Sequence, residues 1–134
     1  MAQPSFSQII SALQSSWAAD TAFIAKEWSP DNPARGQCVV SSLVIQDYLG
    51  GDLGRYKVTA DNLDEMHYYN VLPDGTILDT TGQQYNFPVT LQVLPVNFVG
   101  FASVREKRLS ESETRQRYEL LKSRVSTALH TSNP

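Results

Sequence analysis

The chain has 134 residues, of which 41% are hydrophobic and 19% are charged, and it carries a net charge of −3. A chain of this length can bury about two thirds of its unfolded surface, so we expect one compact domain over residues 1–134. One cysteine excludes an internal disulfide, the negative charge gives no electrostatic reason to bind nucleic acid, and no apolar run approaches the roughly 20 residues of a membrane helix.

The first two predicted elements are helices. Residues 4–17 place apolar side chains at helical spacing with polar residues between them: Phe6, Ile9, Ile10, Leu13 and Trp17. The apolar stripe of this amphipathic helix is expected to pack on the core. Asp20 is expected to cap a short second helix over 21–28, which Ser29-Pro30 ends because the residue before a proline avoids helical backbone angles.

A central helix is expected directly after Cys38. The run over 39–49 is rich in β-branched residues, which also suit a strand. However, its polar residues do not alternate, Val40 and Val44 stand at i, i+4 spacing, and a glycine pair that begins at Gly50 supplies a helix stop. Because most of its circumference is apolar, this helix is expected to lie inside the domain with Cys38 in its first turn.

Three strand candidates follow the glycine pair, over residues 53–60, 66–72 and 76–81. The second and third are joined by the sequence Leu-Pro-Asp-Gly at 72–75. This sequence suits a type I turn with proline at its second position and glycine supplying the positive φ of a bulge. We therefore predict a hairpin with a three-residue loop.

The loop length fixes which side chains share a face of this hairpin. A three-residue loop pairs Leu72 with Thr76, so Asp79 falls opposite Tyr69 and on the same face as His67. The imidazole and the carboxyl are then diagonal neighbours within hydrogen-bonding reach. A two-residue Asp-Gly loop would instead send His67 to the other face.

The C-terminal half is expected to close the domain. Residues 82–104 carry two prolines and short apolar patches that suit one or two further strands, and Ser110 with Glu113 forms a capping-box pattern that predicts a last helix. One side of that helix is apolar, with Tyr118, Leu121, Val125 and Leu129. The predicted fold is α+β, with a central Cys-bearing helix packed on a small antiparallel sheet and with flanking N- and C-terminal helices.

Cys38, His67 and Asp79 supply the residue types of a nucleophilic cysteine site. The thiolate is the reactive form, and a free cysteine with a pKa of about 8.5 offers little of it at neutral pH. A helix N-terminus and a nearby imidazolium both stabilise the anion, and a carboxylate fixes the tautomer and orientation of the ring. The first backbone amides of the helix are suited to hold an oxyanion, and Gln37 or Asn32 is a candidate side-chain donor.

The sequence resembles the YunG-like family of small bacterial proteins over most of 28–125. Three motifs carry the resemblance: Gly-Gln-Cys ending at Cys38, His followed by two aromatic residues and Asn from His67, and Asp-x-Thr-x-x-Gln with a final aromatic residue from Asp79. Gln84, in the third motif, is a further candidate to support the site.

The order Cys, His, Asp, with a hairpin between the last two, more distantly resembles the papain-like and transglutaminase-like fold. That resemblance implies acyl transfer through a thioester. The first hypothesis is therefore a cysteine hydrolase or acyltransferase that acts on an amide or ester in a small molecule or peptide. Cys38 would attack the carbonyl, His67 would protonate the leaving group and then activate water or an acceptor, and Asp79 would hold the ring. This chemistry requires no cofactor.

Two other classes of function stay open. A non-catalytic binding or interaction domain would keep the fold without the activity. A metal site would combine Cys38 and His67 with a carboxylate from the acidic loop, although the histidines and the cysteine lack paired-ligand spacing. That loop, which is also explained as a solvated turn, contains Asp61, Asp64 and Glu65. The single cysteine, and a start without a basic segment and apolar run, favour a reducing, cytoplasmic location without a membrane partner.

Overall fold

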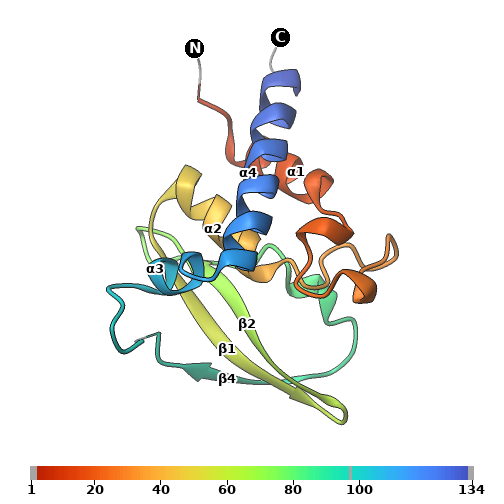
Figure 1. The fold of residues 1–134 in the computed structure, drawn as a ribbon, viewed down its shortest axis with the longest axis vertical. Helices are drawn as coiled ribbons and strands as arrows, with labels where there is room; N and C mark the ends of the chain where they lie inside the picture. Colours follow the sequence, from red (N-terminus) through yellow and green to blue (C-terminus); the bar gives the residue numbers. More distant parts are fainter. Residues whose placement is uncertain (1–2, 97, 133–134) are drawn as a thin grey trace.

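The computed structural model describes residues 3–96 and 98–132, and over these residues it is α+β (Figure 1). The helices are α1 (Phe6–Ser16), α2 (Cys38–Leu49), α3 (Val104–Leu109) and α4 (Ser112–Ser132). The strands are β1 (Asp52–Ala60), β2 (Leu63–Val71), β3 (Ile77–Leu78) and β4 (Thr90–Leu94), and the 3-10 turns are η1 (Ala19–Thr21), η2 (Ala25–Glu27) and η3 (Gly82–Gln84). The antiparallel sheet has the order β3-β2-β1-β4, and the four helices lie to one side of it.

The first predicted helix is present as α1. Its buried face contains Ile9 and Leu13, and the indole Nε1 of Trp17, just past its end, donates a hydrogen bond of 2.8 Å to Ser41 Oγ in α2. Phe6, which the periodicity assigned to the core stripe, is 51% exposed instead. The apolar stripe therefore packs on the core along most of α1 but not at its first turn.

The predicted helix over 21–28 is wrong, because this segment forms two 3-10 turns instead. The backbone N–H of Phe23 donates to the carbonyl of Gly36 at 2.9 Å, so a bond to a distant segment replaces a helical one. Asp20 lies inside η1, and its carboxylate accepts hydrogen bonds of 2.7 and 2.6 Å from the guanidinium of Arg124 in α4. Tertiary contacts therefore override local helix propensity here.

The central helix α2 begins at Cys38, as predicted, and ends at Gly50, which adopts a φ of 74°. Its middle is buried on nearly all sides, with Val40, Leu43, Val44 and Ile45 each at most 2% exposed. Side chains from α1, α4 and β2 surround it in one core. This packing explains why so apolar a sequence forms a helix despite its β-branched residues.

The last helix begins one residue later than predicted, at Ser112. Ser110 ends α3 and donates its hydroxyl to the carbonyl of Lys107 at 2.6 Å, so it does not cap α4. The short helix α3 was not predicted; its N-cap is Ser103, whose hydroxyl accepts from the backbone N–H of Glu106. The predicted apolar side of α4 is confirmed, since it packs on the core through Tyr118, Leu121, Val125 and Leu129.

The predicted register of the β2–β3 hairpin is confirmed. Asn70 pairs with Leu78, the backbone of Leu72 donates to Thr76 at 2.8 Å, and Gly75 has a φ of 88°. Strand β3 is shorter than the predicted 76–81, because the chain turns into η3 directly after Thr81. The carboxyl of Asp79 therefore lies just beyond the strand.

The two faces of β2 have different surroundings. Tyr68 joins the core under the helices, and the amide of Asn70 donates to the carbonyl of Ser42 in α2 at 2.9 Å. Alternation along the strand turns Glu65 and His67 to the opposite face. That face is covered by the segment that includes η3, and it carries the candidate site.

Candidate active site

His67 and Asp79 are in direct contact. The ring nitrogen Nε2 of His67 lies 2.8 Å from Oδ2 and 2.9 Å from Oδ1 of Asp79. The imidazole is 2% exposed, whereas the aspartate side chain is 32% exposed. The carboxylate also accepts from the backbone N–H of Thr81 at 3.3 Å, which holds it in place at the end of the hairpin. These bonds fix the plane of the imidazole and leave its second nitrogen, Nδ1, for other partners.

Cys38 lies beside the same imidazole. It is the first residue of α2 and is partly exposed. Burial lowers the pKa of His67, but hydrogen bonds to Asp79 and to Cys38, and the charges of both groups, raise it more, to about 9. Asp79 contacts the ring of His67 directly, and the thiol of Cys38 lies near enough to contribute to the raised pKa of that ring.

Gln84 contacts His67 from the side opposite Asp79. Its Nε2 lies 3.4 Å from His67 Nδ1, and its Oε1 accepts from Arg35 Nη1 at 3.2 Å and from the backbone N–H of Gly36 at 3.4 Å. Because two donors point at Oε1, the amide is oriented with its N–H₂ group toward the ring. Gln84 therefore supports the imidazole rather than facing an open surface.

The other two candidate donors have different partners. The amide of Gln37 is fully buried, donates to the carbonyl of Ala18 at 3.0 Å and accepts from Thr21 Oγ1 at 2.8 Å. It joins the start of α2 to η1, and its role as a side-chain oxyanion donor stays a prediction. Asn32 donates to the backbone carbonyl of Gln84 at 3.0 Å, which makes it a support for the loop that holds Gln84.

An ion-pair network beside the imidazole was not predicted from the sequence. Arg35 donates to both oxygens of Glu65 at 2.7 and 2.9 Å and to Glu27 at 3.1 Å, and Tyr85 donates its hydroxyl to Glu65 at 2.7 Å. The Tyr85 ring stands edge-on to His67, with the ring centroids 5.3 Å apart. The network thus holds Glu65, Tyr85 and Gln84 in place beside the imidazole.

Glu65 corrects the expectation for the acidic loop. Burial raises the pKa of its carboxyl, but the bonds from Arg35 and Tyr85 lower it more, so the net pKa is below the usual range. Glu65 is therefore an ionised partner of Arg35 rather than part of a solvated turn. No signal within the strand marks this, because the partner is 30 residues away in the chain.

A family model described as "YunG protein" matches residues 5–130 of the chain. The chain belongs to the YunG family. A curated relative from Bacillus subtilis (strain 168), described as "Uncharacterized protein YunG", is 34% identical over 83 residues, which are 62% of this chain and 65% of the relative. The matched region thus spans slightly less than two thirds of the relative's length. No solved structure matches the chain.

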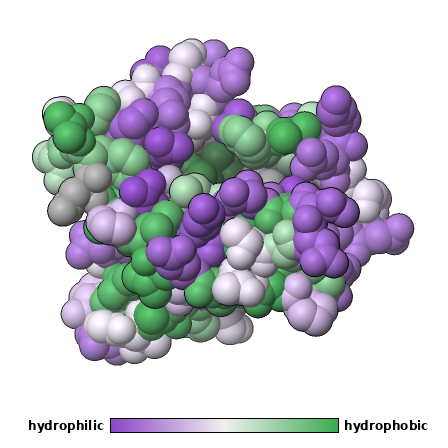
Figure 2. All heavy atoms as spheres, turned by 90° about the horizontal axis from the view of Figure 1, so that it is seen from below, coloured by the Kyte–Doolittle hydropathy of each residue, from purple (hydrophilic) through white to green (hydrophobic). Residues whose placement is uncertain are grey.

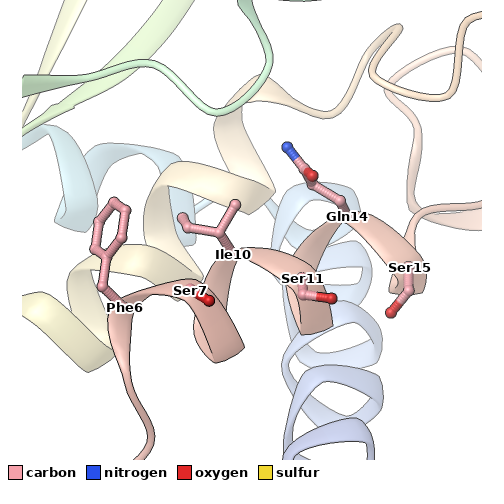
Figure 3. A pocket seen from close by; sticks show the side chains of 6 residues that line it. All are labelled: Phe6, Ser7, Ile10, Ser11, Gln14 and Ser15. Atoms are coloured by element: carbon pink, nitrogen blue, oxygen red, sulfur yellow. The ribbon is translucent and has the colours of Figure 1, made fainter.

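The residues that the YunG family model matches include Cys38, His67 and Asp79. Two hollows of the described surface lie away from these three residues. One hollow of about 610 Å³ lies on α1, where Phe6 and Ile10 stand among polar side chains (Figure 3). A second, of about 700 Å³, lies at the tip of the β1–β2 hairpin. Neither is lined by Cys38, His67 or Asp79.

Two further findings concern the described residues of this YunG-family chain. Within 3–96 and 98–132, no three side chains from His, Cys, Asp and Glu come together as a group that could hold a metal ion. The metal hypothesis, which combined Cys38 and His67 with the acidic loop, thus has no cluster to support it. Over the same residues, no helix has the length and apolar character needed to cross a membrane.

Proposed function

We propose that this protein is a cysteine-dependent hydrolase or acyltransferase that acts on an amide or ester, on a papain-like or transglutaminase-like variant of the α+β fold. The observation that carries the proposal is the position of His67, which contacts the carboxylate of Asp79 through Nε2 and interacts with Cys38 at the first turn of α2. The chain order of the three residues, with a hairpin between the last two, supports the wider fold assignment.

In the proposed reaction the Cys38 thiolate attacks the carbonyl carbon of the substrate. The carbonyl electrons move to oxygen, and the backbone N–H groups at the start of α2 stabilise the oxyanion because they have no partners within the helix. The imidazolium of His67 then gives its Nδ1 proton to the leaving amine or alcohol. The carbon–nitrogen or carbon–oxygen bond breaks, and a thioester to Cys38 remains.

The second half of the reaction regenerates the thiolate. His67 takes a proton from water or from an acceptor nucleophile, which attacks the thioester carbonyl, and the carbon–sulfur bond breaks. Asp79 keeps Nε2 protonated and the ring in one orientation throughout, as a third member does in related triads. The raised pKa of His67, about 9, supports an ion pair between imidazolium and thiolate at neutral pH.

Alkylation of the native protein tests this proposal, because Cys38 is the only cysteine and one adduct mass reports on one site. We expect iodoacetamide to modify the native protein at pH 7 faster than it modifies the urea-unfolded chain, where the thiol is ordinary. His67→Ala should slow the native reaction by roughly tenfold, because the imidazolium no longer stabilises the thiolate. Native alkylation no faster than that of the unfolded chain would contradict the proposal.

Turnover separates an enzyme from a binding domain. The purified protein should hydrolyse members of a panel of small activated esters and amides, and Cys38→Ser should abolish turnover while the fold is kept. His130→Ala is the matched control, since His130 lies near the end of α4 and bonds only to the carbonyl of Ser126. Equal rates for the wild-type protein and Cys38→Ser would favour the non-catalytic binding domain.

A further inference from the structure

One long segment of the chain has no charged side chain. Residues 80–104 are 25 consecutive positions without Asp, Glu, Lys, Arg or His, whereas 19% of the whole chain is charged. At that average the segment would contain about five charged residues. Strand β4 lies within it, and the proposed catalytic chemistry does not use this strand.

Strand β4 is an edge of the sheet, because the strand order places β1 on one side of it and no described strand on the other. Leu91 is 53% exposed and Val93 is 68% exposed, and alternation along the strand places both on the same face. β4 runs along the lower part of the sheet in Figure 1, and the view from below shows apolar side chains in patches between polar ones (Figure 2). An uncovered edge and an uncovered apolar face therefore meet at one strand.

Edge strands of proteins that remain alone are usually protected. Lysine residues, inward-pointing charges, prolines within the strand or bulges prevent pairing with a second strand. The sequence Thr-Leu-Gln-Val-Leu of β4 has none of these charges or prolines, and its pairing with β1 runs without a bulge from Thr90 to Leu94. The strand is therefore open to backbone hydrogen bonds from another chain.

The accessible surface of the chain is larger than that of an average compact monomer of the same mass. The accessible surface is 7707 Å², whereas a compact monomer of this mass exposes about 7,000 Å². The surplus, roughly 700 Å², is close to the roughly 800 Å² that each partner contributes to an interface of ordinary size.

We propose that β4 joins two copies of this chain, which pair antiparallel about a two-fold axis and continue the two sheets into one. A second copy fits because two identical uncharged strands bring no like charges together. Two-fold pairing also uses the same patch on both chains. The register centred on Gln92 pairs all five residues and places Leu91 opposite Val93 of the second copy. Leu91 of each copy then packs against Val93 of the other, once on each side of the axis.

Light scattering during size-exclusion chromatography tests the dimer. At 100 µM we expect a mass twice the chain mass of 14.9 kDa. Val93→Lys should return the protein to one chain mass, because each lysine would place a charge opposite the apolar Leu91 of the second copy and diagonal to the second lysine. The exposed position of Val93 should leave folding intact. Ile77→Lys is the matched control, since Ile77 is 57% exposed at the other end of the sheet. A wild-type monomer at this concentration, or a dimer that Val93→Lys does not weaken, would overturn the proposal.

Cross-linking tests the register. In a Cys38→Ser background, Gln92→Cys places a thiol on the proposed axis, where directly opposite residues have Cα atoms about 5 Å apart and can form a disulfide. We expect mild oxidation to give a covalent dimer from this variant and none from Ile77→Cys in the same background. Equal cross-linking of the two variants, or none from Gln92→Cys, would contradict pairing centred on Gln92.

Discussion

His67 Nε2 and Asp79 Oδ2 lie 2.8 Å apart across the hairpin that joins β2 to β3. The imidazole is buried while the carboxylate reaches the surface, so the pair connects the interior of the site to solvent. Burial alone would favour the neutral ring, and the opposing charge of Asp79 with the Cys38 thiol reverses that preference. The charge state of His67 is therefore set by two neighbours that mutation can remove separately.

Replacing Asp79 with Asn should lower the pKa of His67. The substitution keeps the shape of the side chain but removes the charge that stabilises the imidazolium. We expect the pKa to fall from about 9 by roughly one unit or more, as measured by NMR titration of the ring protons. The chain has only two histidines, and exposed His130 serves as an internal reference. An unchanged titration curve would show that Asp79 does not govern the ring.

The stability of the wild-type protein should fall between neutral and alkaline pH. The pKa of His67 is about 9 in the folded chain and about 6.5 when unperturbed, so the folded state binds this proton more tightly. Its contribution to the free energy of unfolding is complete below pH 6.5 and is lost as the pH rises through 9, by at most about 3 kcal/mol. Urea unfolding at pH 6 and pH 9 measures this loss, and His67→Gln should reduce it. If His67→Gln lost as much stability between pH 6 and pH 9 as the wild type, groups other than His67 would cause the loss.

Gln84 should select the tautomer of His67. Its N–H₂ group can donate to Nδ1 only when that nitrogen carries no proton, so Gln84 favours the neutral ring with its proton on Nε2, facing Asp79. The other groups around the ring are Cys38, Glu65 and Tyr85, and none of them fixes the orientation of the Gln84 amide. That orientation comes from Arg35 and Gly36.

Gln84→Glu and Gln84→Met test this role. A carboxylate at position 84 would accept a hydrogen bond from the protonated Nδ1, so Gln84→Glu should raise the pKa of His67 strongly. Gln84→Met should raise it only slightly, because it removes the bond that favours the neutral ring and its tautomer. The chemical shifts of the two ring nitrogens, measured by ¹⁵N NMR above the pKa, report the tautomer directly. Identical shifts in the wild-type protein and Gln84→Met would exclude a positioning role, even if both variants were folded.

The parts of the site that local rules govern were predictable from the sequence. The turn at 72–75 has a preferred geometry, that geometry fixes the register, and the register places His67 and Asp79 on one face. The start of α2 at Cys38 follows from the broken loop before it and from the helical spacing after it. In each case residues close in sequence determine the outcome.

Partners that are distant in sequence were not predictable in the same way. Arg35 and Glu65 form their ion pair only because the loop before α2 folds against β2, and no local pattern encodes that approach. Gln37 is in the expected place, but Thr21 and Ala18 compete for its amide. The bond from Thr21 to Gln37 ties the first residue of the predicted helix over 21–28 to the residue just before α2, and the chain forms short turns there instead.

Gly54 should resist substitution because Tyr69 lies across it. A Cβ added at Gly54 would overlap the end of the Tyr69 ring, which also stacks on Tyr56 with centroids 4.5 Å apart. Tyr69 is buried and shares its face of β2 with His67, so the ring has little room to move. We expect Gly54→Ala to lower the free energy of unfolding by roughly 1–3 kcal/mol, measured by urea denaturation. In a Tyr69→Leu background the same substitution should cost much less, because the overlapping atoms are gone. An equal cost in both backgrounds would assign the effect to the strand backbone and not to this contact.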